Sequence, residues 1–355
     1  MLKRIIATAA AAGALAFAPA APAQQAINLT LASGYPPVFL FLREIQSNFA
    51  EEVNRELAKS GNRYRINWNF ALSGTLAKIP AMLEAIETAQ AEVGHVSHLF
   101  APGKLPLQNV DGYTPFSVPD HRTSAKLAEE LMKAVPAIGA QYDKLGLVLL
   151  ANFPLDDYVL MSKKPIGSLA DLKGLKVGGA GANLNWLAGS GAVGVATTGA
   201  AAYNDMKSGV FDALLAPMTF VPSGKYHEVA PFMTKVSFNA MTAGQIVANK
   251  AAFAKLPAEV QDAMRKSAAT FQVRYLDALD RAVAEAEKAV AAGGGKVSTF
   301  PREERAKWAA SLPNIAEKWA KELDARGTPG TQTVKAQMDI LRRMGVQPPR
   351  AWDQF

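Results

Sequence analysis

The sequence predicts an α/β protein of two lobes, with a long helix that bridges them and further helices at the C-terminal end. Short apolar strands alternate with helices over much of the chain, an unbroken helical pattern of roughly 35 residues follows Leu256-Pro257, and 355 residues exceed what one core ordinarily holds. We expect lobe I over 24–150 with part of 243–300, lobe II over 151–242, the bridging helix over 256–292, and a helical segment over 296–355 that packs on the lobes.

Residues 1–23 have the pattern of an export signal. Lys3 and Arg4 precede an uncharged run from Ile5 to Ala18, and Ala21-Pro22-Ala23 has the small residues that a signal peptidase needs. The run is too short to cross a bilayer, and no other window approaches the length of a membrane span. We expect a mature periplasmic chain that begins near Gln24 and does not itself span the membrane.

The composition excludes several classes of function. The chain has no cysteine, which rules out disulfides and thiol chemistry. Its formal charge is +7, but the 38 Lys and Arg residues are interspersed among 31 Asp and Glu residues and form no basic block, so we expect no nucleic-acid partner.

The N-terminal part reads as strand, helix, strand, helix, strand, which is half of an α/β molecule. The first and second strands are Ile27–Ala32 and Tyr64–Phe70, and apolar residues from Val38 to Leu57 recur at helical spacing between them. A helix near Ile79–Ala89 and a short strand, Val93–Ser97, complete the unit.

The segment 168–217 reads as a second, smaller parallel-sheet unit. Ser168 is placed to cap a one-turn helix, and strands at Leu175–Val177, Val193–Thr197 and Phe211–Leu215 alternate with helices. The glycines at 178, 179 and 181 leave the following helix N-terminus without bulk, so its N–H groups would be open to a ligand or to another close backbone approach. A ligand crevice is expected at the carboxyl ends of these strands.

The remaining elements connect and cover the lobes. We expect a helix over Thr123–Val135 capped near Asp120, crossover strands at Leu145–Asn152 and Tyr158–Ser162, and a return strand within Thr242–Asn249, where a hinge would act. The bridging helix should end at Gly293-Gly294-Gly295 and reach about 50 Å at 1.5 Å per residue. A strand at Lys296–Phe300 and three helices, from Pro301, over Ile315–Arg326 and over Thr331–Arg343, complete the chain.

No motif supports catalysis or a bound cofactor. The sequence lacks G-x-S-x-G, H-E-x-x-H and a P-loop, so we expect neither an enzyme nor a cofactor. His95 and His98 would share a face on a helix and could bind zinc, but in a strand this spacing sends them to opposite faces, and we expect no metal site.

Four stretches, in order, resemble the DctP-type solute receptors of tripartite ATP-independent periplasmic (TRAP) transporters. They are DLKGLKV (171–177), AAYNDMKSGVFDA (201–213), KYHEVAPF (225–232) and VANKAAFAKLPAEVQDAM (247–264), and the likeness extends over nearly all of the mature chain. The resemblance implies a type II-like periplasmic-binding-protein fold that closes over a small organic solute and delivers it to membrane permease subunits.

The resemblance also implies how the ligand is held, and here the chain departs from the family. Most members bind organic acids through an arginine in the strand after the GLK motif, and that position is Gly178 in this sequence. A second basic position of some members falls at Tyr158, and the usual asparagine-bearing segment reads Leu214–Pro217. Because glycine cannot replace a bidentate guanidinium, we expect a neutral, aromatic or apolar solute, or an acid held by another cation such as Lys78 or Lys104.

Candidate ligand-binding residues follow from the family layout, and each also has a structural interpretation. The aromatic residues would form cavity walls or ordinary core, Asp157 would meet a ligand or lie in a turn, Asn183 would bind a ligand oxygen or cap a helix, and His95 would be a hydrogen-bonding group in the pocket. The set is Tyr158, Phe238, Gly178, Phe153, Trp186, Asn183, Asp157 and His95.

Two other functions remain open from the sequence alone. A receptor of this kind could report to a signalling kinase instead of a transporter, which a neighbouring histidine-kinase reading frame without permease frames would favour. A periplasmic hydrolase is the alternative from another class, and a chromogenic ester or phosphate assay would detect it.

Overall fold

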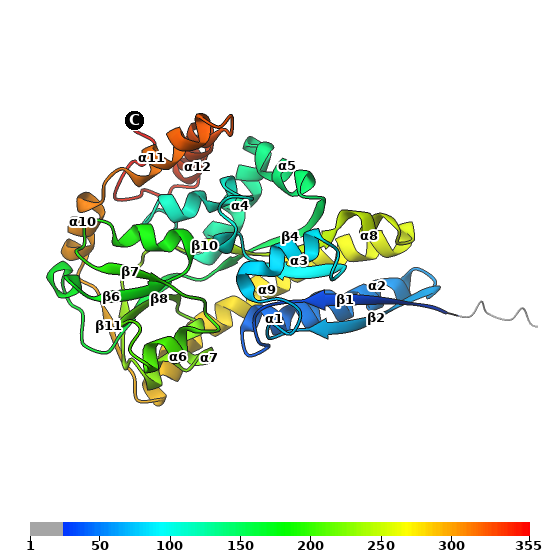
Figure 1. The fold of residues 1–355 in the computed structure, drawn as a ribbon, viewed down its shortest axis with the longest axis horizontal. Coiled ribbons are helices and arrows are strands. Elements are labelled where there is room, and N and C mark those ends of the chain that lie inside the picture. Colours follow the sequence, from blue (N-terminus) through cyan, green and yellow to red (C-terminus); the bar gives the residue numbers. More distant parts are fainter. Residues whose placement is uncertain (1–23) are drawn as a thin grey trace, which may run out of the picture.

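The computed structural model describes residues 24–355, so the expected export signal over 1–23 lies outside the described residues. Two mixed sheets form two lobes that lie side by side, with the N-terminal part of lobe I in blue and cyan and most of lobe II in green (Figure 1). None of the helices among these residues is long and apolar enough to cross a membrane. The predicted two-lobed α/β architecture is confirmed.

Lobe I is built on a five-stranded sheet of order β2-β1-β3-β10-β4. The first three of these strands are parallel, and β10 runs antiparallel to β3 and β4. The strands are β1 (Gln25–Ala32), β2 (Tyr64–Ala71), β3 (Val93–Val96), β4 (Leu147–Leu155) and β10 (Met241–Asn249). The helical elements are α1 (Leu40–Glu44), η1 (Ile45–Ala50), α2 (Glu51–Lys59), η2 (Ile79–Ala81), α3 (Met82–Glu87), η3 (His98–Phe100), η4 (Leu107–Tyr113), α4 (His121–Ala134), α5 (Ala137–Lys144) and α8 (Lys250–Ala254).

Lobe II is built on a six-stranded sheet of order β11-β9-β5-β8-β6-β7. Its three strands β8, β6 and β7 are parallel, and β5 runs antiparallel to both β8 and β9. The strands are β5 (Tyr158–Ser162), β6 (Lys176–Gly179), β7 (Val193–Ala196), β8 (Ala213–Pro217), β9 (Phe232–Lys235) and β11 (Lys296–Thr299). The helical elements are η5 (Leu169–Leu172), η6 (Gly181–Leu187), α6 (Ala202–Lys207), α7 (Phe220–Ser223) and η7 (Tyr226–Glu228).

Helix starts follow the capping residues that the sequence predicts. The Asp120 side chain accepts a hydrogen bond from the Thr123 N–H at the start of α4. Ser168 and Asp171 form a capping box at η5. The glycine-rich stretch differs from expectation, because Gly178 and Gly179 belong to β6 and the helix after them, η6, is a short 3₁₀ helix.

The bridging helix is confirmed as α9 (Ala258–Ala292), which begins after Pro257 and ends at Gly293. Its 35 residues correspond to a length of about 52 Å. It packs against α2, η1 and β4 of lobe I and against α7 and β11 of lobe II, so one helix spans both lobes (Figure 1).

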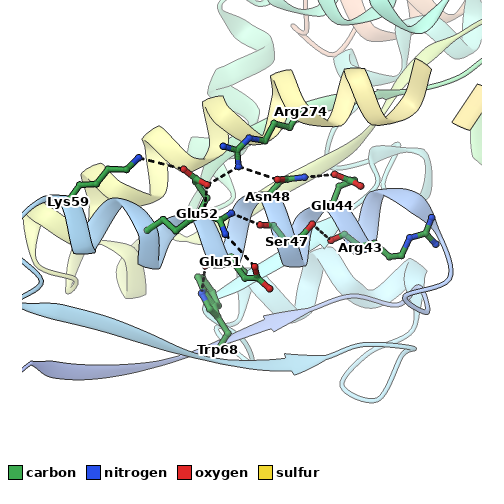
Figure 2. Close-up of polar contacts among 11 residues, drawn as sticks. Arg43, Glu44, Ser47, Asn48, Glu51, Glu52, Lys59, Trp68 and Arg274 are labelled. Carbon is green, nitrogen blue, oxygen red and sulfur yellow. Dashed lines mark hydrogen bonds and ion pairs between the residues drawn. The ribbon is translucent and has the colours of Figure 1, made fainter. Parts of the chain in front are cut away.

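A polar network joins α9 to the first helices of lobe I (Figure 2). The buried carboxylate of Glu52 accepts hydrogen bonds from Arg55 on its own helix (2.6 Å) and from Arg274 on α9 (2.9 Å), with Lys59 at 3.9 Å. The helix before it contains the π-helical turn η1, whose Ser47 carbonyl accepts a hydrogen bond from Arg55 (2.8 Å).

Besides α9, two crossing segments connect the sheets, one between β4 and β5 and one between β9 and β10. Asn239 holds them together, because its carbonyl accepts from the Tyr158 N–H (3.3 Å) and its own N–H donates to Asp157 (3.1 Å). The Asn239 amide oxygen also accepts from the Val118 N–H (2.6 Å). The C-terminal helices cover these segments and both lobes, and they are α10 (Arg302–Ser311), α11 (Ile315–Asp324) and α12 (Gly330–Arg343).

Candidate ligand-binding site

A cavity lies between the lobes, at the carboxyl ends of their parallel strands. Lobe I contributes the segments that follow β1 and β3, and lobe II contributes the ends of β6 and β8 and the loop after β7. The lining residues from lobe I are Tyr35, Phe41, His95, Ser97, Leu99, Leu155, Ala243 and Gly244. Those from lobe II are Tyr158, Gly179, Ala180, Thr197, Thr198, Gly199, Ala202, Leu214, Leu215, Ala216, Pro217, Phe220 and Tyr226.

Aromatic rings from both lobes meet at this cavity. Tyr35 and Phe41 of lobe I lie 6.2 Å and 5.9 Å from the ring of Phe220 on α7 of lobe II, measured between ring centroids. The Tyr226 hydroxyl donates to the Gly199 carbonyl (2.7 Å), and Gly199 lies against the Tyr35 ring. The lobes therefore touch through aromatic packing.

No lining residue within the described part of the chain is Lys, Arg, Asp or Glu. The histidine that lines it, His95, is buried, and burial lowers its pKa to about 3, so the ring is neutral at pH 7. Its Nδ1 lies 3.1 Å from the Ser33 hydroxyl, and its ring packs on Phe41 at 4.6 Å. The cavity thus offers neutral hydrogen-bonding groups on an apolar surface.

The family model of the bacterial extracellular solute-binding proteins, family 7 (DctP), matches residues 43–322. This chain belongs to that family. As a family 7 protein it is an extracytoplasmic solute receptor and not an enzyme.

Solved structures of such receptors have the same fold. A Bordetella pertussis receptor, DctP7, described as binding pyroglutamic acid, has a TM-score of 0.76 and 23% identity over 88% of this chain and 99% of its own. A marine metagenome TRAP protein described as specific for aromatic acid ligands has a TM-score of 0.79 and 21% identity, over 90% of this chain and 99% of its own. A Desulfovibrio salexigens TRAP protein with bound orotic acid has a TM-score of 0.77 and 19% identity, over 89% of this chain and 99% of its own.

Among the predicted site residues of this family 7 protein, Tyr158 and His95 line the cavity. The Tyr158 hydroxyl has no hydrogen-bond partner within 24–355 that satisfies ordinary geometry, and its ring packs edge-on against Trp186 at 5.3 Å. Burial raises the pKa of this hydroxyl, and the nearby Asn183 amide opposes the shift. Asn183 itself is fully buried, and neither atom of its amide has a partner among the described residues.

The other predicted residues lie behind the cavity wall or beside the crossing segments. Phe153 packs between His95 and the α9 residues Phe271 and Tyr275, at 5.0 to 5.9 Å. Phe238 stacks on Trp186 (5.5 Å) in an aromatic cluster that includes Trp308 of α10. These side chains are fully buried and do not line the cavity.

Asp157 and Gly178 also do not line the cavity. Asp157 supports the crossing segment through Asn239, and burial, with the neighbouring charge of Asp156, raises its pKa to about 7. Gly178 faces the ring of Phe211, which is completely buried, so a Cβ there would lie 2.7 to 2.9 Å from three ring atoms. The neighbouring Gly179 lines the cavity instead.

The glycines around the start of η6 are explained by close contacts with other parts of the protein rather than with a ligand. Gly181 has φ +50°, and a Cβ on it would overlap the carbonyl oxygen of Leu99 in lobe I. The close approach that the sequence indicates at this glycine is therefore made by the other lobe.

Sequence reasoning missed several lining residues, including Tyr35, Phe41, Thr198, Phe220 and Tyr226. Tyr35 and Phe41 follow the end of β1, and Thr198 follows β7, so the rule for carboxyl ends of parallel strands could have indicated them. Phe220 and Tyr226 come from α7 and η7, short helices that carry no clear sequence pattern.

Proposed function

We propose that this family 7 protein is the solute receptor of a TRAP-type secondary transporter and that its ligand is an uncharged, aromatic or largely apolar small molecule. The lobes close around the ligand in the cavity, and the closed form delivers it to the membrane permease subunits. The observation that carries the proposal is a cavity that residues 24–355 line with aromatic, aliphatic and neutral polar groups and with no charged side chain.

The electrostatics of the cavity favour an uncharged ligand over a carboxylate. A buried carboxylate without a cationic partner costs several kcal/mol, and His95 is neutral at pH 7 and supplies no charge. The two lysines considered as substitutes, Lys78 and Lys104, do not line the cavity, and Lys104 pairs with Glu87 at 2.5 Å. The replacement of the family arginine by Gly178 is therefore not compensated by another cation from the lining residues.

Neutral groups are placed to orient such a ligand. Tyr158 presents a hydroxyl without a conventional protein partner, with the unpaired Asn183 amide beside it, and Thr198 and Ser97 line the same cavity. A ring with one or two neutral polar substituents fits this combination of apolar walls and hydrogen-bonding groups. The ring compounds named for similar structures, orotic acid and aromatic acids, support a ligand of this shape.

A thermal-shift panel on the purified mature protein tests the proposal. The panel contains uncharged aromatic solutes, aromatic acids and C4 dicarboxylates at one pH and one ionic strength. We expect the largest stabilisation from uncharged ring compounds. A ligand at free concentration L that binds only the folded state stabilises the protein by RT ln(1 + L/Kd), so at equal concentration the tightest-binding ligand gives the largest shift. Stabilisation by succinate, fumarate and malate alone would contradict the proposal.

A further inference from the structure

A second groove, separate from the cavity, lies where lobe II, the crossing segments and the C-terminal tail meet. It has an empty volume of about 850 Å³ and shares no lining residue with the cavity. Its walls come from Phe116–Pro119, from the end of β9 through Ser237, from β11 and the first turn of α10, and from the tail near Val346–Pro349.

Three cationic side chains line this groove, and two of them lack an acidic partner. Lys235 pairs with Glu287 at 2.6 Å. Arg302 and Arg305 form no ion pair within 4 Å with any carboxylate among residues 24–355. Burial lowers the pKa of Arg305 and repulsion from Arg302 adds to that effect, while the buried Asp157 opposes it. The positive charges of two guanidinium groups thus share one groove and are not fully neutralised by nearby carboxylates.

Arg305 is held in place by groups that leave part of its guanidinium free. Its Nε and Nη2 donate to the Ser237 carbonyl (3.1 and 2.9 Å), and the guanidinium lies 5.0 Å from the centre of the Phe116 ring. Its Nη1 has no partner in the described part of the chain. An oriented guanidinium with a free edge is suited to bind an oxyanion.

A buried hydroxyl provides an independent indication of a ligand. Ser117 lines the groove and is 1% exposed, yet its Oγ has no hydrogen-bond partner in the described residues. A buried polar group without a partner is unfavourable, and native structures contain few of them. An oxyanion in the groove would accept a hydrogen bond from this hydroxyl once rotation about χ1 turns Oγ from its enclosed position toward the groove.

We propose that this groove is a second binding site, for a small oxyanion. Its carboxylate or phosphate group lies between Arg302 and Arg305 and accepts a hydrogen bond from Ser117, and any apolar part packs on Phe116 and Phe300. The site adjoins the segment between β9 and β10 that crosses between the lobes. The inference does not depend on what the central cavity binds.

Isothermal titration of the mature protein with inorganic phosphate and, separately, with malonate tests the site at constant ionic strength. Three variants accompany it: Arg302→Gln, whose side chain makes no ion pair to lose, Ser117→Ala, and Arg343→Gln as an exposed arginine outside the groove. We expect saturable binding of at least one anion, weakened about tenfold by Arg302→Gln, weakened by Ser117→Ala, and unchanged by Arg343→Gln.

The two anions distinguish a phosphate site from a carboxylate site. The proposal is overturned if neither anion binds saturably to the unaltered protein. It is also overturned if Arg302→Gln and Arg343→Gln bind the anion equally well, because the binding would then reflect general surface charge.

Discussion

Gly178 occupies the position where family resemblance places an arginine, and its surroundings leave no room for a side chain. The ring of Phe211 lies where a Cβ would project, and both residues are fully enclosed by lobe II. We predict that Gly178→Ala destabilises the protein by about 1–3 kcal/mol because the added methyl overpacks the core. Gly103→Ala, where nothing lies within 4 Å of the new Cβ, serves as the control and should be near neutral.

Urea unfolding followed by circular dichroism measures both variants. The same geometry predicts that Gly178→Arg does not create succinate binding, since the guanidinium would have to displace Phe211 first. A folded Gly178→Arg protein that binds succinate would show that this interpretation of the position is wrong.

Tyr158 and Tyr226 are both cavity tyrosines, but their hydroxyls have different partners. The Tyr226 hydroxyl donates to Gly199, whereas that of Tyr158 has no conventional partner in the described structure. We predict that Tyr158→Phe weakens solute binding about five- to tenfold and barely changes stability, because a ligand hydrogen bond is lost. Tyr226→Phe should lower stability by about 1 kcal/mol. Calorimetry and urea unfolding of both variants would detect the reverse pattern, which would argue against Tyr158 as a ligand group.

The limits of sequence reasoning at this scale are physical. Tyr158 and His95 line the cavity, but sequence reasoning could not separate Phe153 and Phe238 from core, since an aromatic residue in or beside a strand has the same pattern in either place. A Cβ at Gly178 would project toward the ring of Phe211, a residue distant in sequence, so the sequence alone could not show what surrounds this position.

Among elements, the helix that carries η1 and α2 contacts α9 through several polar groups, of which Glu52 is a buried carboxylate (Figure 2). Burial raises the pKa of Glu52, but hydrogen bonds from Arg55 and Arg274 outweigh burial and leave the pKa below its ordinary value. A lowered pKa contributes stability that is present above the unfolded-state pKa of about 4.5 and is lost as pH falls through the folded-state value.

We predict that Glu52→Gln destabilises the protein by about 1–3 kcal/mol at pH 7, because it leaves two arginines without their carboxylate. The difference from the unaltered protein should shrink when the pH is lowered well below 4.5. Glu51→Gln, whose carboxylate is exposed and makes one long contact to Arg55, is the matched control with little expected effect. Unfolding curves at several pH values check this, and a pH-independent difference would count against the proposed role of charge.

Elements with local signals were predictable, and those that depend on distant contacts were not. Asp120, Ser168 and the Pro257 to Gly293 interval mark helix ends through local hydrogen bonding and backbone geometry, and the structure has α4, η5 and α9 at these places. The π-helical turn at Ile45–Ala50 was not predicted, because the apolar spacing from Val38 to Leu57 reads as one regular helix.

In the whole molecule, Gly181 of lobe II lies against the Leu99 carbonyl of lobe I. We predict that Gly181→Ala hinders closure, because its Cβ would overlap that oxygen, and that it weakens solute binding. Gly209→Ala is the matched control, since Gly209 also has a positive φ (+81°) and lies in lobe II but has nothing within 4 Å of an added Cβ. Solution scattering with and without a bound solute should show compaction in the control and little in Gly181→Ala. Equal compaction in both would refute this role of Gly181.

The most direct test of an uncharged ligand is to compare matched pairs of solutes that differ only in a carboxylate. Calorimetry at pH 8 of 3-hydroxybenzamide against 3-hydroxybenzoate, and of uracil against orotate, keeps the ring and changes the charge. We predict that the uncharged member of at least one pair binds at least about tenfold more tightly, because the cavity offers no cation to a buried carboxylate. Tighter binding of the carboxylate members would contradict the account.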